Sequence, residues 1–283
     1  MESVISAINQ NRLSLQFASD GQKDNKDVVL AAVNQDGRAL QYASNKMKGD
    51  IAIVMAAVKN YGCALKYASS IIKNIYKVVE SAVNQYGCAL IYASNQNKEN
   101  IEIALTAVNQ DGRALQYTSS EIRDNIGVVL AAVKQNGLAL EFASENLQGN
   151  FHVVMPSVTQ YGCSLQYASP EMKNDIVIVM AAINHTGFSL QYASPELHRN
   201  FEVTMAAVRQ NGRALEYASH SHQNNKEVVM AAVKQNGAAL EYASAEIKED
   251  INIVIAAIKQ NKWALCSASS NLQEFALIVS NCI

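Results

Sequence analysis

The chain has 283 residues, 49% of them hydrophobic, and a formal net charge of −2 from 23 Lys and Arg against 25 Asp and Glu. This balance supplies no overall basic field for binding phosphates, so the composition argues against nucleic acid as a partner. The apolar stretches are short, and the first six residues contain no basic segment followed by an apolar run. The sequence therefore predicts neither membrane insertion nor an export signal.

The dominant pattern is the motif Leu-x-Tyr-Ala-Ser, which recurs in eleven copies at a constant spacing of 25 residues. Its leucines are Leu15, Leu40, Leu65, Leu90, Leu115, Leu140, Leu165, Leu190, Leu215, Leu240 and Leu265, and a serine follows each four residues later. Such a period is typical of a stacked array in which each unit buries its apolar face against its neighbours. We expect an all-α fold, an α-solenoid of about eleven 25-residue helix-turn-helix repeats. Residues 1–283 should form a single helical repeat domain with partial repeats at both ends.

The first partial repeat is expected to begin inside a helix at residues 2–5, and each later repeat should open with a helix of about three turns. In the repeat at 125–149, Val128, Val129 and Val133 have helical spacing. The helix starts carry Asn or Asp, whose side chains can accept hydrogen bonds from unpaired backbone amides. They are Asn25, Asp50, Asn100, Asn125, Asn150, Asp175, Asn200, Asn225 and Asp250. Ile75 is the exception.

A glycine follows each predicted long helix, except in the two end repeats, where Arg12 and Lys262 replace it. Because glycine enters the left-handed conformation at little steric cost, we expect these glycines to be helix C-caps. The column contains Gly37, Gly62, Gly87, Gly112, Gly137, Gly162, Gly187, Gly212 and Gly237. The next segment, 138–143 in the example, is too short for a stable isolated helix and must be held by packing.

Two polar columns complete the repeat. The serine column should cap a further helical turn, since Ser169 and Ser194 are each followed by proline and glutamate. A glutamine column includes Gln85, Gln110 and Gln135. A buried amide there could bond the turn backbone in each repeat and form a ladder. A role in recognition is the alternative.

After the last full repeat, residues 275–283 supply most of another long helix. Solenoids normally need polar outer caps for solubility. The apolar Phe275, Leu277, Ile278 and Val279 therefore indicate either a special capping helix or a surface for self-association through the C-terminal end.

Cysteine and histidine give little sign of a metal or redox site. The cysteines are odd in number and contain no CxxC pair; they are Cys63, Cys88, Cys163, Cys266 and Cys282. Neighbouring repeats should be roughly 8–10 Å apart, which exceeds disulfide reach, so we expect free thiols in a reducing intracellular compartment. A redox or metal role is the alternative to small-residue packing. The close pair His220 and His222 lacks a third ligand at metal spacing, so a solvated or gap-filling loop is the simpler interpretation.

The sequence contains no Walker loop, no HExxH and no GxSxG, so we expect neither an enzyme nor a bound cofactor. The residues on either side of the turn glycines vary, whereas the Leu, Ala, Ser and Gly columns of the repeat stay fixed. Tyr and Arg are frequent interface anchors. The candidate partner-binding residues are therefore Tyr61, Tyr86, Arg113, Tyr161, Phe188 and Arg213. Surface drift, or packing between adjoining turns, would explain the same variation.

The pattern Val-Val-x-Ala-Ala-Val-x-Gln-Asn-Gly-x-Ala-Leu-x-Tyr-Ala-Ser is clearest at 228–244. Over essentially the whole chain it resembles an uncharacterised repeat family, the domain of unknown function numbered four-one-one-six. Members of that family occur in intracellular bacteria of amoebae, including Legionella-type effector repertoires, and in giant viruses and protists. The resemblance implies an all-helical repeat and a host-directed role, with no catalytic residues to carry over.

Two functions are consistent with these observations. The first is a non-enzymatic scaffold that binds an unidentified protein partner, as a host-directed effector or a targeting module; an effector would act in the host cytosol. The alternative is a modular single-stranded RNA reader in which one repeat meets one base. The net charge and the scarcity of a continuous Lys/Arg stripe favour the scaffold.

Overall fold

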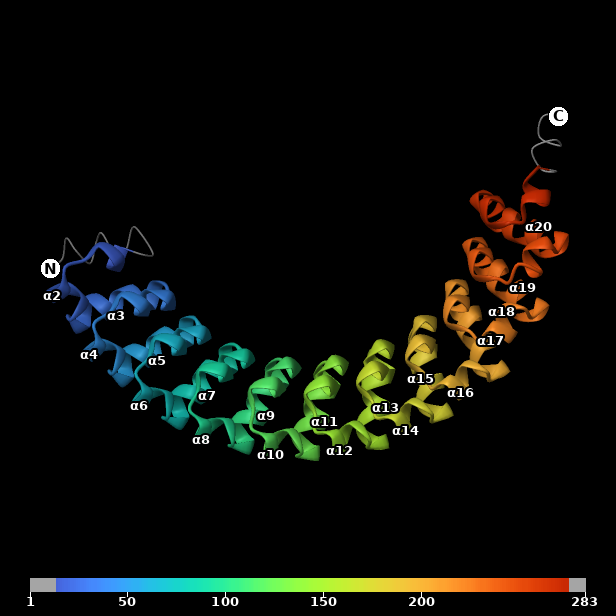
Figure 1. Ribbon diagram of the computed structural model, residues 1–283. Helices are drawn as coiled ribbons and strands as arrows, with labels where there is room; N and C mark the ends of the chain where they lie inside the picture. The colour runs from blue at the N-terminus through green and yellow to red at the C-terminus, as the bar shows by residue number, and fades with distance from the viewer. Residues whose placement is uncertain (1–13, 275–283) are drawn as a thin grey trace. The chain divides into compact units, whose positions relative to one another are not determined.

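The computed structural model describes residues 14–274, and these contain helices and no strands (Figure 1). The all-α tandem-repeat prediction is thus confirmed. The chain divides into two compact units, residues 1–147 and 148–283. That they form a single domain stays a prediction. The terminal segments 1–13 and 275–283 lie outside the described residues. The predictions about the array ends, about Arg12 and about Cys282 concern these two segments.

Each 25-residue repeat contains three helices. The long helices in the first unit are α3 (Lys26–Gln35), α5 (Ile51–Asn60), α7 (Tyr76–Gln85), α9 (Ile101–Gln110) and α11 (Ile126–Gln135). Those in the second unit are α13 (Phe151–Gln160), α15 (Ile176–His185), α17 (Phe201–Gln210), α19 (Lys226–Gln235) and α20 (Ile251–Gln260). Among the described residues, none of the helices has the length and apolar content needed to span a bilayer.

Each long helix is followed by a 3-10 helix in place of the expected short helix. The 3-10 helices are η1 (Ser14–Phe17), η2 (Gly37–Tyr42), η3 (Gly62–Tyr67), η4 (Gly87–Tyr92), η5 (Gly112–Tyr117), η6 (Gly137–Phe142), η7 (Gly162–Tyr167), η8 (Gly187–Tyr192), η9 (Gly212–Tyr217), η10 (Gly237–Tyr242) and η12 (Lys262–Ser267). Six residues of 3-10 helix are unusually many. Packing holds them, because the Ala and Leu of each are fully or almost fully buried from η2 to η10, with Ser164 and Ser189 in the alanine place of η7 and η8.

One short turn of helix then leads to the next repeat. These turns are α2 (Asp20–Lys23), α4 (Asn45–Lys48), α6 (Ser70–Lys73), α8 (Asn95–Lys98), α10 (Ser120–Arg123), α12 (Glu145–Gln148), α14 (Pro170–Lys173), α16 (Pro195–His198), α18 (His220–Gln223) and the 3-10 turn η11 (Ile247–Glu249). The predicted further turn after each serine is therefore confirmed.

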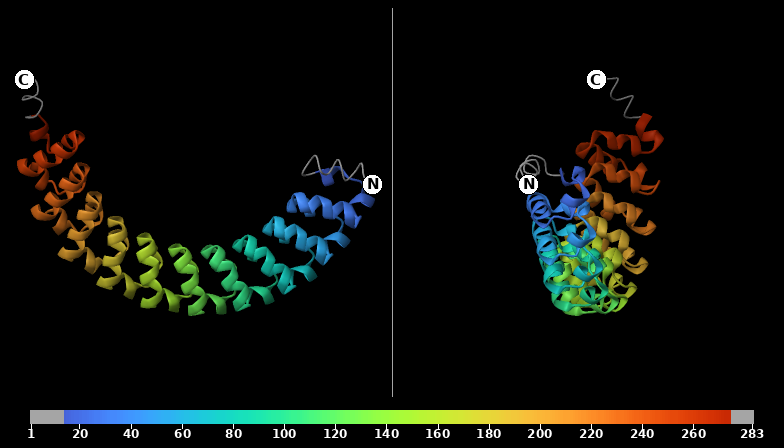
Figure 2. Two further views of the ribbon diagram at one scale, coloured as in Figure 1. Left: turned by 180° about the vertical axis from the view of Figure 1, so that it is seen from behind. Right: turned by 90° about the vertical axis from the view of Figure 1, so that its left-hand side faces the viewer.

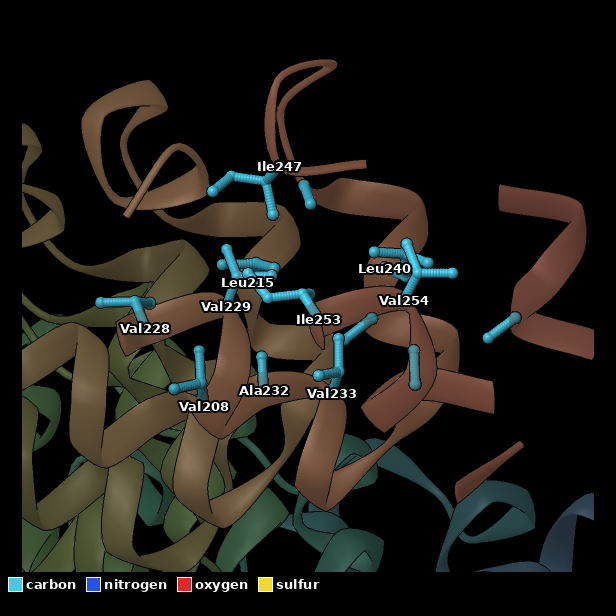
Figure 3. Packing of buried hydrophobic residues seen from close by; sticks show 14 of the residues in the cluster. Val208, Leu215, Val228, Val229, Ala232, Val233, Leu240, Ile247, Ile253 and Val254 are labelled. Atoms are coloured by element: carbon cyan, nitrogen blue, oxygen red, sulfur yellow. The ribbon is translucent and has the colours of Figure 1, made fainter. Parts of the chain in front are cut away.

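The core of each unit lies between a layer of long helices and a layer of 3-10 helices. Within a unit, each long helix packs on the next long helix and on both adjoining 3-10 helices, so the stack is continuous (Figure 2). The third, fourth, seventh and eighth positions of a long helix are buried throughout, apart from the partly buried Ile258 of α20. In the second unit, Val208, Leu215, Val229, Leu240 and Ile253 meet from successive repeats (Figure 3).

The predicted N-caps of the long helices are confirmed. The Asn25 side chain accepts hydrogen bonds from the amides of Asp27 and Val28, at 3.1 and 3.2 Å. Ile75, the exception in the sequence, makes no side-chain cap bond.

The serine column joins repeats as well as capping. Ser244 Oγ accepts a hydrogen bond from the Ile247 amide at 3.2 Å and donates one to Asn224 Oδ1, in the preceding repeat, at 2.6 Å. Ser94 and Ser194 donate to Asn74 and Asn174 in the same way. A hydroxyl can do both tasks, whereas a carboxylate can only accept. The double task explains why serine fills this column.

The prediction that the glycines are left-handed C-caps is wrong, because no described residue has a positive φ. The residue before the glycine ends the long helix in extended conformation, as Asp111 does at φ −151° and ψ 109°. A Cβ atom on Gly112 would lie 2.5 Å from the carbonyl oxygen of Ala132, in the next long helix. The column is glycine because the following repeat leaves no room for a side chain.

The glutamine ladder is confirmed, but it runs between repeats and its members are largely exposed. Gln135 Oε1 accepts a hydrogen bond from the amide of Gly112 at 2.6 Å. Gln235 makes the same bond to Gly212 at 2.6 Å, and its Nε2 lies 3.4 Å from the carbonyl oxygen of Gln210. Each amide thus links the turn and the long helix of the preceding repeat to its own.

Candidate functional site

The predicted partner-binding residues lie on the turn rim, which we define as the residues directly before and after each turn glycine. Tyr61, Tyr86 and Arg113 belong to successive repeats of the first unit, and Tyr161, Phe188 and Arg213 to successive repeats of the second. The structure thus brings each group of three together along the rim of its own unit.

The residue before the glycine caps the following 3-10 helix in some repeats and does not cap it in others. Where it is Asp or Asn, its side chain caps the 3-10 helix, as Asn136 does by accepting from the Leu138 amide at 3.0 Å. Tyr61, Tyr86 and Tyr161 make no such cap bond and remain 38%, 39% and 43% exposed. Capping therefore does not account for the tyrosines.

Arg113 is held by its own turn. Its guanidinium donates to both carboxylate oxygens of Asp111, at 3.0 and 2.8 Å, and Asp111 Oδ2 also lies 3.4 Å from Cys88 Sγ. The hydrogen bond from Arg113 lowers the pKa of Asp111. Burial, followed by the charge of Asp111, raises the pKa of Cys88 to about 11. At neutral pH this thiol is protonated and is not activated as a nucleophile.

Arg213 and Phe188, candidates in the second unit, also have side-chain contacts. Arg213 Nη2 donates to the hydroxyl of Tyr242 at 2.6 Å, and its guanidinium lies 5.7 Å from the centre of that ring. Phe188 packs edge-on against Tyr217 at 6.3 Å between ring centres. Packing between adjoining turns, the alternative left open by the sequence, therefore accounts for part of this rim.

A second surface, which the sequence reasoning missed, is the outward side of the long helices. We call it the groove face: the second, fifth, sixth and ninth positions of each long helix. In α15 it includes Val177, which is 55% exposed, beside Ile176 at the first position, which is 42% exposed. Residues 176–183 are apolar all round although only one side of α15 is buried. An all-round apolar helix at the edge of a layer is the signal that could have revealed this surface.

Hollows follow this face between neighbouring long helices. One of about 470 Å³ lies between α17 and α19 and is lined by Met205, Arg209, Glu227, Met230, Ala231, Lys234 and Gln235. Another of about 630 Å³ lies between α3 and α5 of the first unit and includes Met55 and Lys59. The groove face thus has a hollow between two neighbouring long helices in each unit.

The groove face differs in polarity along the chain. In α7, Glu80 occupies the fifth position, where most long helices carry Met or Leu, and it forms an ion pair with Lys77 at 3.0 Å. The neighbouring Tyr76 hydroxyl donates to Glu102 at 3.0 Å, and this hydrogen bond is the main cause that raises the pKa of Tyr76 to about 12. The groove face is thus charged in α7, whereas in α15 its four positions carry no charged side chain.

The last residue of each short helix forms another column that the sequence reasoning missed. In the first unit it is basic in five successive repeats: Lys23, Lys48, Lys73, Lys98 and Arg123. Two of its counterparts in the second unit donate to carbonyls of the preceding 3-10 helix. Lys248 Nζ reaches the Glu241 oxygen at 2.8 Å, and Gln223 Nε2 reaches that of Leu215 at 3.2 Å. Lys and Gln share this task, which indicates a structural use of the column.

The cysteines and histidines that the structure describes show no arrangement suited to binding a metal ion. Cys63, Cys88, Cys163 and Cys266 are free thiols, as predicted. Within residues 14–274, no group of three or more His, Cys, Asp and Glu side chains could hold a metal ion. His222 is buried, and its Nδ1 lies 2.9 Å from the Thr204 hydroxyl, so it packs against α17 of its own repeat.

Comparison with known proteins identifies the family. The model of the domain of unknown function DUF4116 matches residues 25–73, 50–98, 76–123, 100–148, 150–198, 200–248 and 225–273. Each match spans two structural repeats. No curated protein and no solved structure matches the chain. Because these matches cover most of its length and keep the register of the repeat, the chain belongs to the DUF4116 family.

Proposed function

We propose that this chain is a non-enzymatic scaffold that binds a partner protein through the groove face of its long helices. The observation that carries the proposal is that large apolar side chains are exposed on the layer of long helices. The core beneath this layer is formed by other positions of the same helices. Val177, at the second position of α15, and Ile255, at the fifth position of α20, are 55% and 44% exposed, while the third, fourth and seventh positions of both helices are buried. Exposed apolar surface of this kind is typical of protein-binding sites.

The repeat frame supports this use. The core, the serine links and the glutamine ladder occupy fixed columns, so the groove face and the turn rim can change without loss of the stack. Family membership supports a host-directed role, as an effector or a targeting module, and the host cytosol is the compartment in which we expect such a scaffold to act.

The test is capture of proteins from a host-cell lysate on the immobilised full chain, followed by cross-linking and mass spectrometry. We expect a partner that is retained by the wild type and lost with Val177→Glu, which puts a charge on the apolar face. Asn95→Glu is the matched control, since Asn95 is exposed on the short helix α8 and gains the same charge. Both variants should keep the wild-type circular dichroism.

Loss of the partner with the double variant Tyr86→Ala and Arg113→Ala, but not with Val177→Glu, would move the site to the turn rim. A chain that retains no protein under conditions where it is folded contradicts the scaffold proposal.

A single-stranded RNA reader is the second candidate. The run of basic residues from Lys23 to Arg123 favours it, because it places one cation per repeat in the first unit. A reader should lose affinity for RNA steeply as salt rises, in proportion to the phosphates it contacts. Binding that is absent at 50 mM salt, or that is insensitive to salt, excludes this function.

A further inference from the structure

We infer that the groove face of α17, α19 and α20 holds an amphipathic partner helix that carries carboxylates along one flank. This inference rests on the proposed scaffold function and specifies its partner. Three successive long helices of the second unit form the site, and each contributes residues at the same four positions.

The floor of the site is apolar. The fifth positions are Met205, Met230 and Ile255, and the sixth positions are all alanine. Met205 is 5% exposed at the bottom of the hollow between α17 and α19, whereas Ile255 is 44% exposed. The small alanines let a partner come close, and the flexible methionines can adapt to its side chains.

The two sides of the site carry opposite charges. Arg209, Lys234 and Lys259 occupy the ninth positions on one side, and Glu202 and Glu227 occupy second positions on the other. Seven residues of helix separate the two rows, which corresponds to about 10.5 Å along the axis. An α-helix with side chains is about 10–12 Å across, so it fits between the rows, whereas an extended strand would not fill the width.

The three cations are the reason why we propose an acidic partner. Arg209, Lys234 and Lys259 are exposed, and the ion pairs found among residues 14–274 include none of them. The dipole of each helix favours a base in its last turn. That effect acts equally in α13 and α15, which have Thr159 and Asn184 at the ninth position. The dipole therefore does not explain an uninterrupted row of three.

The spacing of the row fixes the pattern expected in the partner. Packed helices lie roughly 8–10 Å apart. Residues seven positions apart in an α-helix lie on one side of it, two turns or about 10.5 Å apart, which is close to that spacing. A partner that crosses α17, α19 and α20 should therefore present Asp or Glu at intervals of seven residues beside an apolar stripe.

The experiment uses a display library of 22-residue helical peptides, in which the apolar face and both flanks are randomised, panned against the full chain. We expect enrichment of peptides with acidic residues on one flank at intervals of seven. Synthetic copies should bind with an affinity that falls as salt rises, because the charges are exposed. Arg209→Glu with Lys234→Glu should weaken their binding at least tenfold.

The matched control is Lys59→Glu with Lys134→Glu, which reverses the same helical position in α5 and α11 and should leave binding unchanged. Failure to enrich any peptide, enrichment without acidic residues, or equal losses in the two double variants would overturn the inference. A lysate partner that Arg209→Glu with Lys234→Glu still captures would also overturn it, yet would leave the scaffold function intact. Peptide binding without any lysate partner would instead count against the scaffold function alone.

Discussion

Replacement of Gly112 by alanine tests the interpretation of the glycine column most directly. The new Cβ would lie 2.5 Å from the Ala132 oxygen, whereas real Cβ contacts essentially never fall below 3.0 Å. The difference of 0.5 Å must come from a backward shift of α11, since the obstacle is backbone. Overpacking costs about 1–3 kcal/mol. The shift also strains the 2.6 Å bond between Gly112 and Gln135, which adds about 0.5–1.5 kcal/mol.

We therefore expect Gly112→Ala to lower the free energy of unfolding by about 2–4 kcal/mol, measured by urea denaturation. Gly21→Ala is the matched control, because nothing lies within 4 Å of a Cβ atom there, and it should be neutral or slightly stabilising. Since arrays of this kind unfold locally, hydrogen exchange in α9 and α11 should report the loss even where the global transition hardly moves. Equal stability of the two variants would refute the close-contact interpretation.

Three further perturbations test the frame. Leu140→Ala should cost about 2–5 kcal/mol because Leu140 is fully buried, whereas Glu141→Ala should be nearly neutral in the same denaturation assay. Ser244→Asp keeps the acceptor of the cap but not the donor to the preceding repeat, so it should recover only part of the roughly 1–2 kcal/mol lost in Ser244→Ala. The pKa of Asp111 is lowered in the folded chain, so its contribution to stability is present above the unfolded pKa and is lost as pH falls through the folded value. Arg113→Gln should flatten this loss at pH values below the unfolded pKa of about 3.9, and an unchanged pH profile would show that the ion pair has no net effect.

The elements that could be predicted from sequence are those whose cause lies within a few residues. Asn25 caps α3 through amides two and three positions later, and Ser244 caps its turn through the amide of Ile247. Such local bonds have fixed spacing, so the residue type is enough to predict them. The 25-residue period then gives the stack, because only a neighbouring repeat can cover the apolar side of each long helix.

The errors arise where the cause lies in another repeat. Gly112 is required by Ala132, twenty positions further along, and no local rule distinguishes that contact from a left-handed cap. The exposure of Ile176 and Val177 was not predicted, because they have the same apolar character as their neighbours Ile178 and Val179, which are core. Only the placement of the second layer shows which side of an all-apolar helix remains uncovered.

The fold separates stability from recognition by position. In each long helix, the third, fourth, seventh and eighth residues are committed to the core, and the tenth in most repeats to the glutamine ladder. The second and ninth residues are exposed and contribute little to the stack, so their residue type can vary between repeats, as Asn184 in α15 and Arg209 in α17 show. Because neighbouring repeats bring equivalent positions side by side, one substitution per repeat is enough to build a row of charge or an apolar stripe. The row formed by Arg209, Lys234 and Lys259 is the longest uninterrupted example at the ninth position, and for that reason we place the partner helix there.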